Sequence, residues 1–164
     1  MLLILIIETG IMKINIIIVD KKSKDVLYAP LIEHYKNMIN RFSDFEIIEV
    51  FNKNISKAQD ISSIKAQQSY TEALSSYLKN GYNIALDPSS KIVDSHQFGE
   101  LMRDKGVVNF FIGGAYGFEK SFLDMCDRKV SFGEITMSHK LVKVVLSEQI
   151  FRGLSIINNH PYHK

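Results

Sequence analysis

The sequence predicts an α/β fold in which helices cover both faces of a mostly parallel β-sheet. Runs with the composition of buried strands alternate along the chain with helix-like segments, which is the order that parallel sheets require. The first run, residues 13–19, consists almost entirely of Ile and Val beyond Asn15. Such a run is typical of a strand that is buried on both faces, so the sheet is expected to lie between two helical layers.

Strands and helices are expected in strict alternation. The strands are predicted at residues 13–19, 44–51, 82–87 and 107–112, with a weak last strand at 129–135 that Gly133 interrupts. The helices are predicted at residues 26–41, 56–79, 95–105, 119–128 and 139–153.

Local signals set most of these boundaries. Pro30 stands near the start of the first helix, where proline is tolerated, and apolar residues recur through that segment at helical spacing. Residues 56–79 are mostly polar but carry an apolar stripe, and Asn80-Gly81 ends them. Asp94 or Ser95 is expected to cap the helix that follows the third strand.

The last helix has an unusually broad apolar face. Its members are Leu141, Val142, Val145, Leu146, Ile150 and Phe151. Because this face is wider than packing on one sheet requires, we expect the helix to lie at or against a dimer interface.

Length and composition limit the classes of protein to which the chain can belong. The chain of 164 residues fits one domain and, at 46% hydrophobic, can bury a substantial core. A net charge of +2 does not by itself indicate a nucleic-acid partner, so any basic face must be local. Cys126 is the one cysteine, which suits a reducing compartment such as the cytoplasm. No run approaches the length that spans a membrane.

A glycine loop follows the strand at 107–112 directly. Glu119 precedes Lys120, so the Gly-Lys-Ser/Thr of a P-loop is absent. Gly113 and Gly114 are adjacent, so the spacing of a Rossmann fingerprint fails as well. What remains is a glycine-lined ligand pocket at the carboxyl ends of strands, with an ordinary tight turn as the alternative.

No metal site is expected. His160 and His163 have a spacing seen in metal sites, but Cys126 is distant and no acidic cluster is nearby. His139 starts the last helix and is expected to be structural.

Three segments resemble the bacterial SPOUT-superfamily methyltransferases of the RlmH type, which modify a pseudouridine of large-subunit ribosomal RNA at N3. They are FFIGGAYGF at 110–118, ITMSHKLVKVVLSEQIFRG at 135–153 and NHPYHK at 159–164. The first strand and LDPSSK at 86–91 fall in the right places, so the resemblance covers nearly the whole chain from Met12 onward. Departures occur at Asp20, Ser138 and Lys143, where the family commonly has Gly, Pro and Arg.

The resemblance also bears on the start of the chain. Residues 2–7 are an apolar run that lacks the charged start of a secretory signal. Met12-Lys13 opens a strand in the manner of the family. We therefore expect residues 1–11 to be an upstream extension and residues 12–164 to be a single SPOUT domain, with an added edge strand as the alternative.

The resemblance implies a C-terminal deep trefoil knot whose loops bind S-adenosyl-L-methionine. The implied cofactor-binding residues are Leu86, Gly113, Gly114, Phe132, Gly133, Glu134, Ile135, Thr136 and Met137. Phe132, Ile135 and Met137 would pack on the adenine ring, and ordinary core packing is the alternative for these three. A branched side chain at Gly114 is expected to occupy the space that the ligand needs.

The resemblance further implies methyl transfer to 23S ribosomal RNA in the assembled ribosome by a homodimer. The N3–H of pseudouridine must lose its proton, so a base or a stabilising positive charge would help. Arg152, Tyr162 and His163 are the candidate catalytic residues, and a tail that merely docks on the core is the alternative. A non-catalytic ribosome-assembly factor or a SPOUT enzyme of another specificity are the alternative functions.

Overall fold

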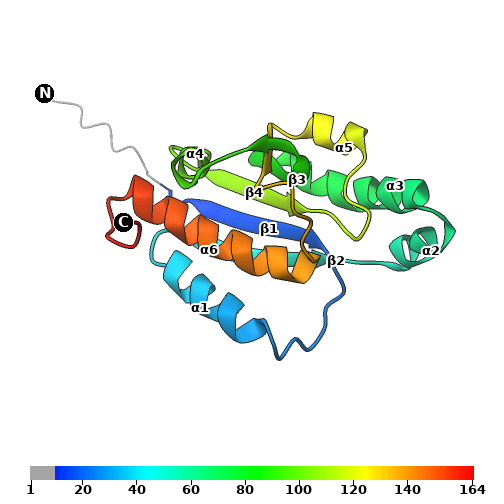
Figure 1. Cartoon of the computed structure of the whole chain (residues 1–164), viewed down its shortest axis with the longest axis horizontal. Coiled ribbons are helices and arrows are strands. Elements are labelled where there is room, and N and C mark those ends of the chain that lie inside the picture. The colour runs from blue at the N-terminus through cyan, green and yellow to red at the C-terminus, as the bar shows by residue number, and fades with distance from the viewer. Residues whose placement is uncertain (1–9) are drawn as a thin grey trace, which may run out of the picture.

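The structure, a computed structural model, describes residues 10–164 and is built around a five-stranded parallel sheet (Figure 1). The strand order is β2-β1-β4-β3-β5. The strands are β1 (Lys13–Val19), β2 (Asp44–Val50), β3 (Tyr82–Ile92), β4 (Val107–Ile112) and β5 (Arg128–Ser131). The expected extension at residues 1–11 falls mostly on residues 1–9, which lie outside the described part, and it stays a prediction.

Helices cover both faces of the sheet, as predicted. They are α1 (Ala29–Ile39), α2 (Lys53–Ile61), α3 (Ser63–Leu74), the 3-10 helix η1 (Ser75–Lys79), α4 (Ser95–Glu100), α5 (Lys120–Met125) and α6 (His139–Ile157). One face of the sheet packs against α1, α4 and α6, and the opposite face packs against α2, α3 and α5. Alternate residues of β1 enter the two cores: Ile16 faces α6 and Ile17 faces α3. The trefoil knot stays a prediction from the family.

The predicted long helix at 56–79 is wrong in detail, because Ser62 interrupts it. Ser62 has an extended backbone (φ −168°), and its side chain accepts a hydrogen bond from the Lys65 N–H as the N-cap of α3. Asn52 caps α2 in the same way. The segment is therefore two helices and a 3-10 turn, and it begins three residues earlier than predicted.

Other boundaries also move. The first helix begins at Ala29 because Asp25 Oδ1 accepts hydrogen bonds from the N–H groups of Leu27 and Tyr28, which hold a turn before it. β3 continues to Ile92, and its register against β5 shifts between Leu86 and Lys91. β5 ends at Ser131 rather than at residue 135.

Much of the broad apolar face of α6 is covered within the chain itself, although Leu141 is 37% exposed. α6 lies across the sheet between α1 and α4 (Figure 1), and Leu146, Ile150 and Leu154 are buried in the core that these elements share. The expected place of α6 at a dimer interface stays a prediction. None of the described helices is long and apolar enough to cross a lipid bilayer.

Candidate active site

A cavity of about 340 Å³ opens at the carboxyl ends of β3, β4 and β5. Its walls are the end of β3, the glycine loop (residues 113–117), the pocket loop (residues 132–138) and the first turns of α6. Parallel α/β sheets bind ligands at this edge, and the volume lies in the range of small-molecule sites.

The structure brings nearly all of the predicted cofactor residues together at this cavity. Those that line it are Leu86, Gly113, Gly114, Phe132, Gly133, Ile135, Thr136 and Met137. Glu134 does not line it and instead borders a separate shallow recess with Pro88, Ser89, Ser90 and Ile92.

The apolar residues of the pocket loop differ in their surroundings. Phe132 packs against the main core, with its ring edge-on to Phe98 at 5.5 Å. Ile135 is 81% exposed and packs against no core residue. Phe132 therefore packs in the core, which was the alternative to a cofactor contact, whereas Ile135 has an apolar surface that is free for a ligand.

Sequence reasoning missed Ser131, which ties the cavity walls together. Its hydroxyl accepts a hydrogen bond from the Gly133 N–H at 3.0 Å and lies 3.1 Å from the carbonyl oxygen of Pro88. Its side chain is buried. The register between β3 and β5 creates this contact, and no local motif signals it.

Glycines shape the cavity in two ways. Gly117 (φ +69°) and Gly133 (φ +135°) have backbone conformations that suit glycine, and a Cβ on either would meet no atom within 4 Å. These two glycines leave open space beside the cavity. A Cβ on Gly114, in contrast, would lie 2.6 Å from Cζ of Tyr70. The space at Gly114 is therefore taken by a protein side chain, which corrects the expectation that a ligand needs it.

Helix α3 holds the glycine loop in place. Tyr70 is fully buried beneath the loop, and its hydroxyl accepts a hydrogen bond from Gln59 Nε2 at 2.6 Å. Gln67 Nε2 donates to the carbonyl oxygen of Tyr116 at 2.8 Å. The loop that lines the cavity is thus fixed by side chains from α2 and α3.

The departures from the family pattern meet at the start of α6. Ser138 caps the helix by accepting a hydrogen bond from the Leu141 N–H. Asp20 Oδ1 lies 3.2 Å from Nε2 of His139, which lines the cavity. Lys143 is buried, and its Nζ lies 3.1 Å from Oε1 of Glu49. Each departure therefore has a structural partner in this chain.

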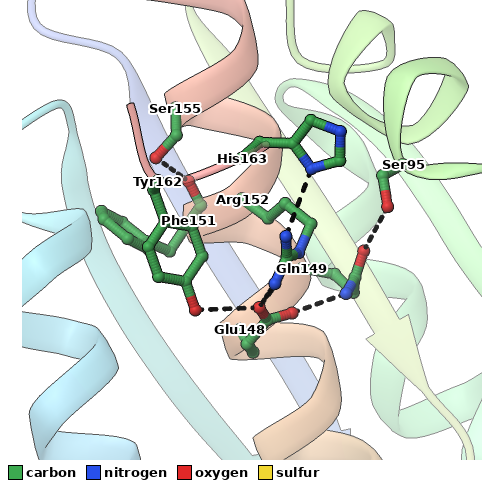
Figure 2. A network of polar contacts seen from close by, with 8 residues as sticks. All are labelled: Ser95, Glu148, Gln149, Phe151, Arg152, Ser155, Tyr162 and His163. Carbon is green, nitrogen blue, oxygen red and sulfur yellow. Dashed lines mark hydrogen bonds and ion pairs between the residues drawn. The ribbon is translucent and has the colours of Figure 1, made fainter. Parts of the chain in front are cut away.

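The candidate catalytic residues meet at Glu148 (Figure 2). Glu148 Oε1 accepts hydrogen bonds from Arg152 Nε at 3.1 Å and from the Tyr162 hydroxyl at 3.0 Å. Arg152 Nη1 lies 3.2 Å from Nδ1 of His163. Because a guanidinium only donates, Nδ1 accepts and the ring proton of His163 is on Nε2. Arg152, Tyr162 and His163 form one network, and sequence reasoning missed its central carboxylate.

Glu148 also raises the pKa values of Arg152 and Tyr162. Its hydrogen bond raises the pKa of Arg152, so the guanidinium stays positive. Burial, followed by the hydrogen bond to Glu148, raises the pKa of Tyr162 to about 12. Tyr162 is therefore a neutral hydrogen-bond donor near neutral pH.

The C-terminal tail docks on the far end of α6. The His160 N–H donates to the Ser155 carbonyl, and the Tyr162 ring packs on Phe151 at 4.6 Å. Arg152 comes thirteen positions after His139, which lines the cavity, and this is about 20 Å along the axis of α6. The tail and the cavity of one chain are thus apart, as Figure 1 shows for the two ends of α6.

Among residues 10–164, no group of three His, Cys, Asp or Glu side chains lies close enough to share a metal ion.

The fold and the cavity define an α/β protein with a cavity of small-molecule size at the carboxyl edge of a parallel sheet. A family model described as "Predicted SPOUT methyltransferase" matches residues 12–163. The chain belongs to this family of SPOUT methyltransferases.

Relatives match along their full length. A protein of Sulfurovum sp. (strain NBC37-1) named Ribosomal RNA large subunit methyltransferase H is 65% identical over 153 residues, 93% of this chain and 100% of the relative. Proteins of the same name from Wolinella succinogenes and Aliarcobacter butzleri are each 48% identical, again over 93% of this chain and 100% of theirs.

One solved structure is similar in fold. A probable methylase family protein from Haemophilus influenzae Rd KW20 superposes with a TM-score of 0.55 at 12% identity, over 92% of this chain and 70% of that one. This likeness shows the fold alone.

Proposed function

We propose that this protein transfers a methyl group from S-adenosyl-L-methionine to N3 of a pseudouridine in 23S ribosomal RNA, in the assembled ribosome of the cytoplasm. One observation carries the proposal: a relative named as a large-subunit ribosomal RNA methyltransferase is 65% identical along its whole length. The cavity at the carboxyl edge of the sheet supplies a place for the cofactor.

The cavity fits such a cofactor on physical grounds. Its walls combine apolar surface, such as Ile135 and Val142, with backbone amides and carbonyls of the pocket loop. Gly117 and Gly133 leave space that any other residue would fill. Apolar surface suits an adenine ring, and backbone groups can read its edge without particular side chains. Bound there, the cofactor would supply an electrophilic methyl group on a sulfonium.

The tail network suits the substrate side of the reaction. Loss of the N3 proton leaves a negative charge on the pseudouridine ring, and the positive Arg152 can stabilise it. Tyr162 keeps its proton and can orient the base by a hydrogen bond or by stacking. His163 accepts from Arg152 through Nδ1, so it presents Nε2–H as a donor in this arrangement.

The separation of about 20 Å between tail and cavity supports a homodimer. Arg152 and Tyr162 cannot reach the cavity of their own chain while they are docked at the far end of α6. In a symmetric dimer the same surface is presented twice, so the tail of one subunit can complete the cavity of the other. We propose this shared site as the working form.

The proposal is tested by mass spectrometry of ribosomal RNA from cells that lack the gene, with and without the gene restored. The expected result is an unmethylated pseudouridine that gains one methyl group at N3 on restoration. Methylation that is unchanged by loss of the gene would contradict the proposal, and methylation of another nucleotide would assign a different specificity. Binding of labelled S-adenosyl-L-methionine without methyl transfer would indicate a non-catalytic factor.

A further inference from the structure

The loop between β1 and α1 carries Lys21, Lys22 and Lys24, whose residues are all exposed. The loop begins next to the cavity wall, because Asp20 at its start lies 3.2 Å from Nε2 of His139, which lines the cavity. These lysines therefore stand beside the mouth of the site.

Two further lysines extend the positive surface. Lys140 Nζ donates to the Ser23 hydroxyl at 3.0 Å, which places it against the same loop. Lys21 Nζ lies 4.8 Å from the ring centre of Phe51, and Lys53 follows two residues later. We call the set formed by Lys21, Lys22, Lys24, Lys53 and Lys140 the basic rim.

The basic rim is not neutralised by its neighbours. Within residues 10–164, no carboxylate lies within 4 Å of the ammonium groups of these lysines, since every ion pair found there involves other residues. The nearby carboxylates are engaged elsewhere: Asp20 pairs with His139, and Glu49 pairs with Lys143. Asp25 accepts two backbone N–H bonds, and the bond from Tyr28 is the main cause of its lowered pKa, with a smaller contribution from the charge of Lys140, to which it forms no ion pair within 4 Å.

We propose that the basic rim binds the phosphate backbone of the RNA strand that carries the target base. The proposal rests on the proposed function and adds the surface on which the substrate lies. A chain with a net charge of only +2 has little general attraction for RNA. Unpaired lysines gathered at the mouth of the cavity supply the local charge, and lysine ammonium groups are well suited to phosphate.

The test measures binding of large ribosomal subunits, isolated from cells that lack the gene, as a function of salt. The rim variants are Lys22→Gln with Lys24→Gln, and the charge reversals Lys22→Glu with Lys24→Glu. The matched controls are Lys79→Glu with Arg128→Glu, because Lys79 precedes β3 and Arg128 begins β5, at the amino ends of these strands. S-adenosyl-L-methionine affinity, measured by calorimetry, reports that each variant keeps its fold and pocket.

We expect the rim reversal to weaken subunit binding by about tenfold or more at low salt, while the control is affected far less. The rim glutamine variant should lower the slope of log affinity against log salt by about 0.7 to 0.9 for each phosphate group that the variant no longer binds. The proposal that the basic rim binds RNA would be contradicted if the rim and control variants lost affinity equally. It would also be contradicted if the rim glutamine variant kept the wild-type slope of log affinity against log salt. Wild-type protein that binds subunits through the rim but methylates nothing would leave the rim standing and overturn the proposed function.

Discussion

The ring of Tyr70 lies directly against Gly114, so that a Cβ added at Gly114 would be 2.6 Å from Cζ and 2.7 Å from the hydroxyl of Tyr70. Tyr70 is fully buried and is held by Gln59. Any side chain at position 114 must therefore displace either a core tyrosine or the glycine loop. Packing between α3 and the loop thus shapes the cavity wall, and ligand contact is not needed to explain this glycine.

The first prediction tests that contact by a double-mutant cycle. Gly114→Ala should lower the free energy of unfolding by about 1 to 3 kcal/mol through overpacking and should weaken cofactor binding as the loop shifts. Tyr70→Ala alone should cost about 3 to 5 kcal/mol, because it leaves a cavity. In the Tyr70→Ala background, Gly114→Ala should lower the free energy of unfolding much less than it does in the wild type. Urea unfolding and calorimetry measure these effects.

Gly106→Ala is the matched control for this cycle, since a Cβ there meets no atom within 4 Å. It should leave both stability and cofactor affinity close to wild type. Strictly additive costs for Gly114→Ala and Tyr70→Ala would show that the two residues do not clash.

The strands could be predicted from the sequence, because runs such as residues 13–19 have no other stable place than a buried sheet. The broken helix could not, because Ser62 is compatible with a helix interior and acts as a cap only once α3 packs against the sheet. The cavity residues near the glycine loop followed from the family pattern. Glu134, between two residues that line the cavity, borders a separate recess, and its role in binding stays a prediction.

The hydrogen-bond network at the tail was also only partly predictable from the sequence. Glu148 and Arg152 are four residues apart on α6, a spacing that sequence shows to be a possible ion pair. The contacts of Tyr162 and His163 depend on the chain turning back at Asn159, whose φ is +55°. Asn159 and Pro161 are signals of a helix end, but they do not show where the tail docks afterwards, so the central role of Glu148 was not predicted.

The second prediction concerns the ionisation of Tyr162. The difference between the ultraviolet tyrosinate titrations of wild type and Tyr162→Phe should show a group with a pKa of about 12. Because the pKa is raised in the folded chain, the associated stability is present below pH 10 and is lost as the pH rises towards 12. Glu148→Gln should move the pKa of Tyr162 downward. A difference titration centred on the ordinary value of 10.0 would contradict the buried hydrogen bond.

The third prediction concerns the pair formed by Lys143 and Glu49. Lys143→Ala removes the partner of Glu49 in a mostly buried setting, and it should lower the free energy of unfolding by about 3 kcal/mol. Lys143→Arg keeps the charge and should cost much less. Chemical denaturation measures both, and equal stability of the alanine and arginine variants would show that the ion pair has no structural role.

The fourth prediction separates the cavity from the tail. A chain lacking Tyr162, His163 and Lys164 should methylate ribosomes far more slowly, because Arg152 and Glu148 lose their partners. Its affinity for S-adenosyl-L-methionine should stay within a few fold of wild type, since the cavity is about 20 Å away along α6. Calorimetry and methyl incorporation measure the two properties. If the truncated chain methylates at the normal rate, the tail has no role in the reaction and only docks on the core. If the truncated chain loses cofactor binding, the tail is part of the cofactor pocket.

The site shared between subunits is tested most directly by mixing two defective chains. One lacks residues 162–164, and the other carries Gly133→Val, where valine meets a strained backbone at φ +135° and points into open space beside the cavity. Each chain alone should be inactive. A dimer of the two has one site with an intact cavity and an intact tail, so it should recover about half of the wild-type methylation of ribosomes. A mixed dimer that forms but shows no activity would contradict the shared site.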